Sequence, residues 1–342
     1  MNAKPSHSSY IFAAAFIALS LIPGAWTIAH TPVANLNSDV IDGAAQRHYE
    51  ERFEDMFLLR DSLRQTWSAL KFGLLGEMDE GAIESPSGIL FTAEEFMPPQ
   101  ETRDFGDALL HAKIRVEAAG AELVPVIIPD KARMLSEHWP QPRSASFIAR
   151  YDVALTEAKA LDLRAVDLRK VLGGPMSFMK TDTHWSPEGA QSVAVALAEV
   201  LKESIQVTTT FHTTQTGGRD FKGDLVAFAD TGVWRPLVGP ASETIGTFET
   251  FSEANGGLGL FGEAHIPVAL VGTSFSARQD FHFEGFLKSE LQADVVSFAL
   301  QGQGPFTPMD RFLDGEHLEE VKPDIVLWEI PERYLNTWSD PQ

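Results

Sequence analysis

The stretch ALVGTSFS, residues 269–276, changes within eight residues from an apolar run to small and hydroxyl-bearing side chains. An apolar run of this kind, here residues 268–271, is typical of a parallel strand that is buried on both faces. Gly272 allows the chain to turn tightly, and ligands of an open α/β sheet bind beyond the carboxyl ends of its strands. The stretch therefore predicts an α/β fold with Ser274 at the edge where a nucleophile would act, although a glycine and a serine after a strand also form ordinary turns.

Further strands and helices alternate along the rest of the chain. Apolar segments predict strands at residues 88–91, 123–128, 164–168, 295–298 and 325–328. Helical spacing and helix-start signals predict helices at residues 46–72, 104–119, 146–159, 187–202 and 281–291. The alternation indicates a parallel sheet with helices on both faces. Residues 204–262 are rich in Thr, Gly and Phe without a helical period, which predicts a β-rich insertion.

The first thirty residues of the chain contain a long uncharged segment. Residues 10–29 form a run of twenty residues without a charge. At roughly 1.5 Å per residue, a helix of this length spans the bilayer core of about 30 Å. The run is longer than the apolar part of a signal peptide, so we expect residues 1–30 to be an uncleaved membrane anchor or, as the alternative, a cleaved signal peptide. Either way the remainder is exported, and we divide it into a linker at 31–45 and one domain at 46–338.

Composition excludes several classes of partner and chemistry. The 342 residues carry 27 Lys plus Arg against 48 Asp plus Glu, for a formal net charge of -21. A field of that sign repels phosphate backbones, so nucleic acid is not an expected partner. The chain has no cysteine, which excludes disulfides, thiolate metal sites and cysteine nucleophiles.

A second stretch, KTDTHWSPEG at residues 180–189, supplies what a serine nucleophile requires. A serine hydroxyl needs a base, and the base needs a third group that fixes its tautomer. Asp182 and His184 lie two residues apart and can face Ser274 together. The alternatives are a turn cap with a histidine packed beside Trp185, or a metal site. Metal is the poorer explanation because catalytic zinc needs at least three protein ligands and the other histidines show no paired spacing.

Together with several shorter blocks, these two stretches resemble the alginate O-acetyltransferase family. The blocks are DTHW and SPEG within residues 182–189, GTSFS at 272–276, SGILF at 87–91, PDKAR at 129–133, GDL at 223–225 and WEIPER at 328–333. The resemblance covers residues 46–335 and implies an SGNH-hydrolase-like fold in which the Asp-x-His block precedes the serine. Two departures are Ile89 where the family has Trp, and Thr273 where the hydrolases have Asp. Because the chain ends soon after Arg333, we expect the AlgJ branch rather than the AlgX branch with its added carbohydrate-binding module.

The resemblance also implies a function. It suggests an O-acetyltransferase in the periplasm, anchored to the inner membrane and acting on an exopolysaccharide such as alginate. It further implies a membrane-bound acyltransferase that delivers acetyl groups, and no dissociable cofactor. Without residues 1–30 the chain has 26 basic and 48 acidic residues, for a net charge of -22. Because this charge repels a polyuronate, a neutral polymer remains an alternative substrate. The alternatives are a carbohydrate acetyl esterase with the same triad, and a non-catalytic polymer-binding or scaffold subunit.

Beyond the triad, some residues near these blocks are candidate substrate contacts. They are Lys131, Trp185, Phe275, Ser276 and Arg333. The two cations suit a substrate carboxylate, or else an ion pair with Glu329. The two aromatic rings would stack on a sugar or belong to the core.

Overall fold

The computed structural model describes residue 18 and residues 21–31, 43–99, 103–139, 143–207, 209–253 and 265–335. Contacts divide the chain into two compact units. Residues 1–76 and 230–239 form the first, and residues 77–229 and 240–342 form the second. The second unit contains every candidate site residue, so it is the part of the chain that builds the site.

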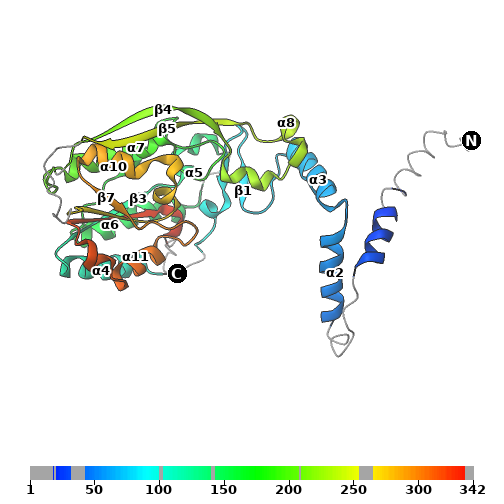
Figure 1. Cartoon of the computed structure of the whole chain (residues 1–342), viewed down its shortest axis with the longest axis horizontal. Coiled ribbons are helices and arrows are strands. Elements are labelled where there is room, and N and C mark those ends of the chain that lie inside the picture. The colour runs from blue at the N-terminus through cyan, green and yellow to red at the C-terminus, as the bar shows by residue number, and fades with distance from the viewer. Residues whose placement is uncertain are drawn as a thin grey trace, which may run out of the picture. The chain divides into compact units, whose positions relative to one another are not determined.

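The centre of the second unit is a four-stranded parallel sheet (Figure 1). In spatial order its strands are β3 (Glu122–Ile128), β8 (Ile325–Pro331), β6 (Val268–Val271) and β7 (Val295–Ser297). All three pairings are parallel, so the carboxyl ends of the strands meet at one edge. The central strands β6 and β8 lie side by side, which brings the segments after residues 271 and 331 together at the edge where such sheets bind ligands. The expected parallel sheet is confirmed.

Helices cover both faces of this sheet (Figure 1). On one face lie α7 (Pro187–Leu201) and α10 (Phe283–Leu291), and on the other α4 (Phe105–Ala118), α6 (Ala145–Ala160) and α11 (Phe306–Asp314). The strand side chains alternate between the two cores, as the pleat requires: Leu270 packs with the first set and Val271 with the second. Both faces are therefore apolar, which explains why the strands read as continuous apolar runs.

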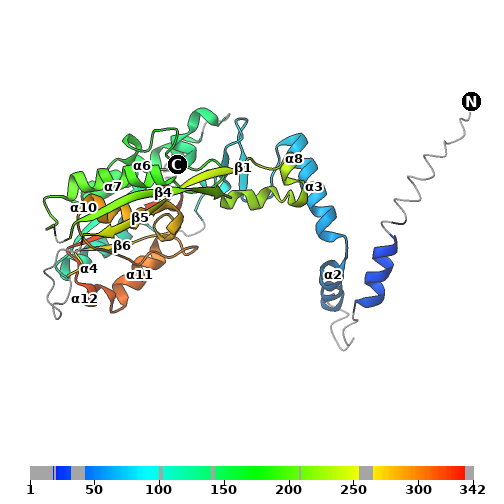
Figure 2. The same cartoon turned by 45° about the horizontal axis from the view of Figure 1, so that its top comes forward.

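A two-stranded antiparallel ribbon forms a further layer outside α10 (Figure 2). It consists of β4 (Phe211–Phe221) and β5 (Glu243–Ser252), both of which contact α10. The ribbon confirms the β-rich character expected for 204–262 in the described part of that range. Residues 208 and 254–262 lie outside the described residues.

The remaining elements of the second unit are short. They are β1 (Ala82–Glu84), β2 (Leu90–Thr92), α5 (Lys131–Met134), α9 (Ser274–Ala277), α12 (His317–Val321) and 3-10 turns at Ala93–Phe96, Ser136–His138, Leu168–Lys170, Asp224–Ala229, Gln279–Phe281 and Glu332–Tyr334.

The start of α7 follows the sequence signal closely. Ser186 is extended, and its hydroxyl accepts a hydrogen bond of 3.0 Å from the N–H of Gly189, while Pro187 is the first helical residue. A hydroxyl at the cap accepts from an N–H that has no acceptor within the helix. Proline at the first helical position has no N–H, so no donor there lacks an acceptor. This helix carries the segment that precedes it, residues 180–186, to the edge of the sheet.

The strand expected at residues 164–168 was wrong. The structure places a 3-10 turn at Leu168–Lys170, and the described residues 164–167 belong to no strand. Asp167 accepts a hydrogen bond of 3.2 Å from the N–H of Arg169 and so favours a turn. Arg164 donates to the carboxylate of Glu122, which holds the segment beside β3 through side chains rather than through a backbone ladder.

The first unit contains the helix expected at residues 46–72, but in two pieces. These are α2 (Ala44–Met56) and α3 (Arg60–Leu75). Phe57 adopts an extended conformation (φ -69°, ψ 110°) and ends the first piece. The unit also contains a 3-10 turn at Gly232–Trp234 and α8 (Arg235–Val238), and Trp234 Nε1 donates a 3.0 Å hydrogen bond to Thr66 Oγ1 of α3.

The expected membrane anchor falls largely outside the described residues. Residues 1–17, 19 and 20 are not among them, whereas residues 21–30 are helical. Within the described ranges, no helix has both the length and the apolarity to cross a membrane.

Candidate active site

The nucleophile candidate Ser274 occupies the first turn after the central strand β6. It is the first residue of α9, and Thr273 Oγ1 caps this short helix by accepting from the N–H of Phe275 at 3.3 Å. Gly272 has no room for a side chain, because a Cβ atom there would lie 2.5 Å from Glu329 Oε2. The glycine therefore lets the turn approach a buried carboxylate on β8.

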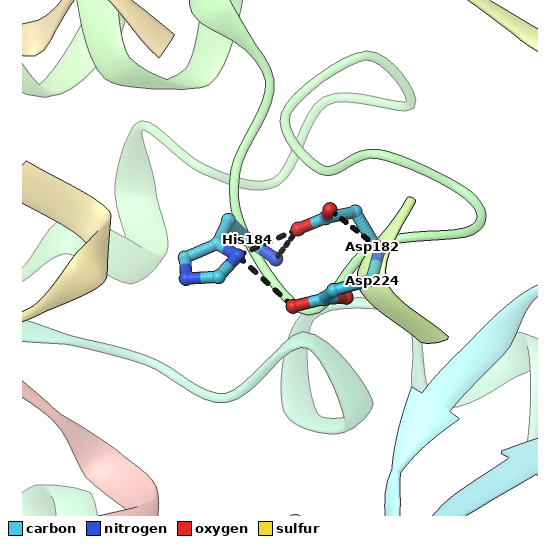
Figure 3. Close-up of side chains that lie close together, drawn as sticks. All are labelled: Asp182, His184 and Asp224. Atoms are coloured by element: carbon cyan, nitrogen blue, oxygen red, sulfur yellow. Dashed lines mark hydrogen bonds and ion pairs between the residues drawn. The ribbon is translucent and has the colours of Figure 1, made fainter. Parts of the chain in front are cut away.

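The structure brings Asp182, His184 and Ser274 together. His184 Nε2 lies 2.7 Å from Ser274 Oγ, and His184 Nδ1 lies 2.6 Å from Asp182 Oδ1. Because the buried carboxylate can only accept, Nδ1 carries the proton and Nε2 is free to accept from the serine hydroxyl. Figure 3 shows the Nδ1 edge of the ring facing the carboxylates, with the other nitrogen directed away. This arrangement is that of a nucleophile, a general base and the group that orients the base.

The second oxygen of Asp182 is also fully engaged. Asp182 Oδ2 accepts from the N–H of Asp224 at 2.9 Å and from Arg278 Nη1 at 3.0 Å. Burial favours the neutral acid, but the hydrogen bond and electrostatic interaction with His184 and the charge of Arg278 outweigh it and hold the pKa of Asp182 well below its usual value. Asp182 therefore stays ionised and keeps the imidazole in one orientation.

Arg278 and Asp224 are site residues that the sequence reasoning did not single out. Arg278 follows the nucleophile by one turn, and its Nη2 also donates to Asp280 Oδ2 at 2.7 Å. Asp224 belongs to the GDL block, and its Oδ1 accepts from the N–H of Thr183 at 2.8 Å. The signal for Asp224 was present as a matching block, whereas nothing in the sequence paired Arg278 with Asp182.

Three oxygen and nitrogen atoms of Asp182, His184 and Asp224 lie within 4.8 Å of one another, close enough for a metal ion (Figure 3). Asp224 Oδ2 lies 3.5 Å from His184 Nδ1. However, the ligand atoms of Asp182 and His184 already bond to each other, and Arg278 supplies a positive charge at the same carboxylate. The donor set therefore fits an oriented base better than a cation site.

Glu329 is a buried carboxylate beneath the nucleophile turn. It accepts from the N–H of Thr273 at 2.7 Å, from Thr273 Oγ1 at 3.0 Å and from Ser276 Oγ at 3.1 Å. Burial raises the pKa of Glu329 to about 7. Because the Thr273 N–H points at this carboxylate, it is not available to a reacting oxygen. The N–H of Ser274 is the next donor along the turn.

Three residues that were expected to contact the substrate are buried and contact other parts of the protein instead. Ser276 is buried, and its hydroxyl faces Glu329 rather than a ligand. Trp185 and Phe275 are also buried, with ring centroids 5.2 Å apart, and Phe275 packs at 4.6 Å from the His184 ring. Phe275 thus packs between the imidazole and Trp185, and because both rings are buried they offer no face to a sugar.

Lys131 is likewise not placed for a substrate. Its ammonium group is buried and donates to the carbonyl oxygens of Leu90 at 2.5 Å, Lys180 at 3.2 Å and Asp182 at 3.0 Å. Burial lowers the pKa of Lys131 to about 8. Its three donors are used in holding the Asp182 loop against β2, which is a structural role, and the ion pair expected with Glu329 is not formed.

Arg333 is the remaining candidate, and it borders a cavity of about 270 Å³. Its guanidinium carbon lies 5.4 Å from the ring centroid of Phe275. Its Nε lies 2.9 Å from Glu94 Oε2, so the neighbouring carboxylate is Glu94 rather than the expected Glu329.

Comparison with known proteins identifies the family to which this chain belongs. Residues 84–332 match the family model described as "SGNH hydrolase-like domain, acetyltransferase AlgX". The chain belongs to this acetyltransferase family. It is also 33% identical to "Probable alginate O-acetylase AlgJ" of Pseudomonas aeruginosa, over 97% of this chain and 90% of that protein.

Two solved structures of the family agree with the fold. The O-acetyltransferase domain of Pseudomonas putida AlgJ has a TM-score of 0.66 and 30% identity, covering 76% of this chain and 94% of that one. The structure of Pseudomonas aeruginosa AlgX has a TM-score of 0.58 at 22% identity, covering 75% of this chain and 63% of that one, and supports the fold alone. The expected family, the SGNH-like α/β fold and the class of enzyme, an O-acyltransferase, are confirmed.

Proposed function

We propose that this chain transfers acetyl groups to hydroxyls of an exported polysaccharide, alginate or a related polymer, through an acetyl ester on Ser274. The observation that carries the proposal is the continuous hydrogen-bonded chain from Asp182 through His184 to Ser274. The relatives named as probable alginate O-acetylases support the choice of polymer.

The geometry supports a two-step reaction. His184 Nε2 takes the proton of the Ser274 hydroxyl while Oγ attacks the acetyl carbonyl of the donor. The donor group then leaves with that proton, and acetyl-Ser274 remains. In the second step His184 deprotonates a sugar hydroxyl, which attacks the acetyl carbonyl, and the proton returns to Ser274 Oγ as the sugar ester departs. We assign stabilisation of the oxyanion in both steps to the N–H of Ser274, because the N–H of Thr273 is bonded to Glu329.

The cellular setting belongs to the same proposal. We place the enzyme in the periplasm, held at the inner membrane by residues 10–29, where a membrane-bound acyltransferase supplies the acetyl groups. The uncharged run in the sequence supports the anchor. The reaction as proposed needs no dissociable cofactor, because each proton transfer is made by His184.

The test uses the purified full chain and a chromogenic acetyl ester, with and without an oligosaccharide acceptor. Chromophore release that is lost on Ser274→Ala supports the acyl-serine, and a mass gain of one acetyl group on the acceptor supports transfer. Release with free acetate as the sole product would make the protein an esterase. No release from a folded chain would favour a polymer-binding subunit and overturn the proposal.

A further inference from the structure

Arg333 is a buried guanidinium without a hydrogen bond. Its side chain is only 6% exposed, and it donates to no acceptor among the described residues. Its Nε lies 2.9 Å from Glu94 Oε2, but the N–H is not directed at that oxygen. A buried cation that is not hydrogen-bonded costs free energy, so proteins normally pair such groups.

Two neighbouring arginines in the same unit do donate hydrogen bonds to a carboxylate, although Nη1 of Arg150 also has no partner among the described residues. Arg133 donates to Glu332 Oε2 at 2.8 Å and Oε1 at 2.6 Å, and Arg150 Nε donates to Glu332 Oε1 at 3.2 Å. Glu332 is adjacent to Arg333 in the chain, so acceptors are present in this region. The guanidinium of Arg333 bonds to none of them; its carbon lies 5.4 Å and 5.0 Å from the ring centroids of Phe275 and Tyr334, and the residue borders a cavity.

That cavity lies along the same edge of the sheet as the nucleophile. It has a volume of about 270 Å³ and is bordered by Arg333, Tyr334, Glu94, residues 97–99 and the loop at residues 302–304. The N–H of Leu300, just before that loop, donates to the carbonyl of Gly272 at 3.0 Å, which ties the loop to the turn before Ser274. The volume is slightly below the roughly 300–1,000 Å³ usual for small-molecule sites, a size suited to a single sugar unit.

We propose that Arg333 binds the carboxylate of a sugar-acid unit in this cavity and thereby selects a polyuronate as acceptor. The inference rests on the proposed function. The Nη1–Nη2 edge offers two parallel N–H donors, which match the two oxygens of a carboxylate, while Nε stays beside Glu94. In a chain with a net charge of -21, a local buried cation provides the attraction that an anionic polymer needs.

The experiment compares two acceptors on the full chain. One is an oligouronate, and the other is the same oligomer with its carboxylates reduced to alcohols. Arg333→Met should lower the ratio of kcat/KM for the oligouronate to that for the reduced oligomer by about 10- to 100-fold, through KM, because a charge-assisted pair is lost. The inference would be overturned if Arg333→Met lowered kcat/KM equally for both acceptors, so that their ratio did not change. It would also be overturned if the variant lowered ester cleavage without acceptor by the same factor.

Two further variants separate recognition from folding. Arg115→Met removes an arginine paired at 3.0 Å with Asp314 on the surface, and should leave the ratio unchanged. Glu94→Gln removes the carboxylate that competes for Arg333, and should lower the KM for the oligouronate several-fold. If Arg333 served only an ion pair, Arg333→Met and Glu94→Gln would instead lower the Tm together and leave the ratio alone, against the inference.

A binding measurement keeps this inference distinguishable from the proposed function. The Ser274→Ala chain cannot form the acetyl ester, yet it should bind the oligouronate, and Arg333→Met in that background should weaken binding about 10- to 100-fold. If wild-type chain cleaves no ester, the proposed function fails while this titration still decides the subsite. If oligouronate and reduced oligomer bind alike, the subsite fails even when acetyl transfer is observed.

Discussion

Glu329 should make the stability of this enzyme fall as the pH rises through neutrality. Its carboxyl is buried under the nucleophile turn, and burial raises its pKa from 4.5 to about 7. The native state therefore retains a proton that the unfolded chain releases between these two values, and stability is lost as pH rises across that window. A shift of about 2.5 units corresponds to roughly 3 kcal/mol, because each unit is worth about 1.4 kcal/mol.

Glu329→Gln removes the titration while keeping an oxygen to accept from the Thr273 N–H. We expect the free energy of unfolding of the variant, relative to wild type, to increase by about 3 kcal/mol between pH 4.5 and pH 8. Urea unfolding at a series of pH values measures the difference, in which all other titrating groups cancel. Glu319→Gln, at an exposed position of α12, is the matched control and should give a flat difference. A difference for Glu329→Gln that does not vary with pH would refute the reasoning.

The other predictions concern the triad and the turn that holds it. Ser274→Ala should lower ester cleavage by at least about 10³-fold without changing the unfolding curve, since the proposed mechanism makes the hydroxyl the attacking group; cleavage near the wild-type rate would contradict this. Arg278→Met should cost about 2–3 kcal/mol at pH 7, whereas Asp280→Asn, which spares the bond to Asp182, should cost less than about 1 kcal/mol. The Arg278→Met loss should shrink as pH falls below about 4, because the pKa of Asp182 is depressed in the folded state and its stabilisation disappears in acid; equal losses at pH 3 and pH 7 would argue against it. Gly272→Ala should destabilise the chain by about 2 kcal/mol and lower kcat, as judged by urea unfolding and ester cleavage, because its Cβ would lie 2.5 Å from a buried carboxylate.

Some parts of the site were predictable and others were not. The DTHW and GTSFS blocks indicated Asp182, His184 and Ser274 because nucleophile, base and orienter are distinct residue types in local motifs. The roles of Lys131 and Ser276 were misjudged. A lysine or a serine in a conspicuous block can serve a substrate or a buried carbonyl and carboxylate equally well, and the residue type does not distinguish the two.

The sequence by itself determined the elements that rest on local rules. Nearly continuous apolar runs indicated β3, β6 and β8, because strands buried on both faces carry mostly apolar side chains. A hydroxyl before a proline likewise marked the start of α7. The segment at 164–168 shows the limit of such rules, because a strand exists only where a neighbouring backbone completes its hydrogen bonds.

Tertiary structure alone decided which charges meet. Arg278 reaches Asp182 across 96 residues, and Glu329 reaches Thr273 across 56. It also decided that Arg333 has no hydrogen-bond acceptor among the described residues, while the carboxylate of Glu332, one residue earlier, accepts hydrogen bonds from Arg133 and Arg150. The physical reason is that the free energy of a charged group depends on its burial and on the atoms within a few ångströms, and packing distant segments together sets both. The sequence could name the candidate triad, but only the fold could show that Arg278 meets Asp182 and that the buried Arg333 borders a cavity.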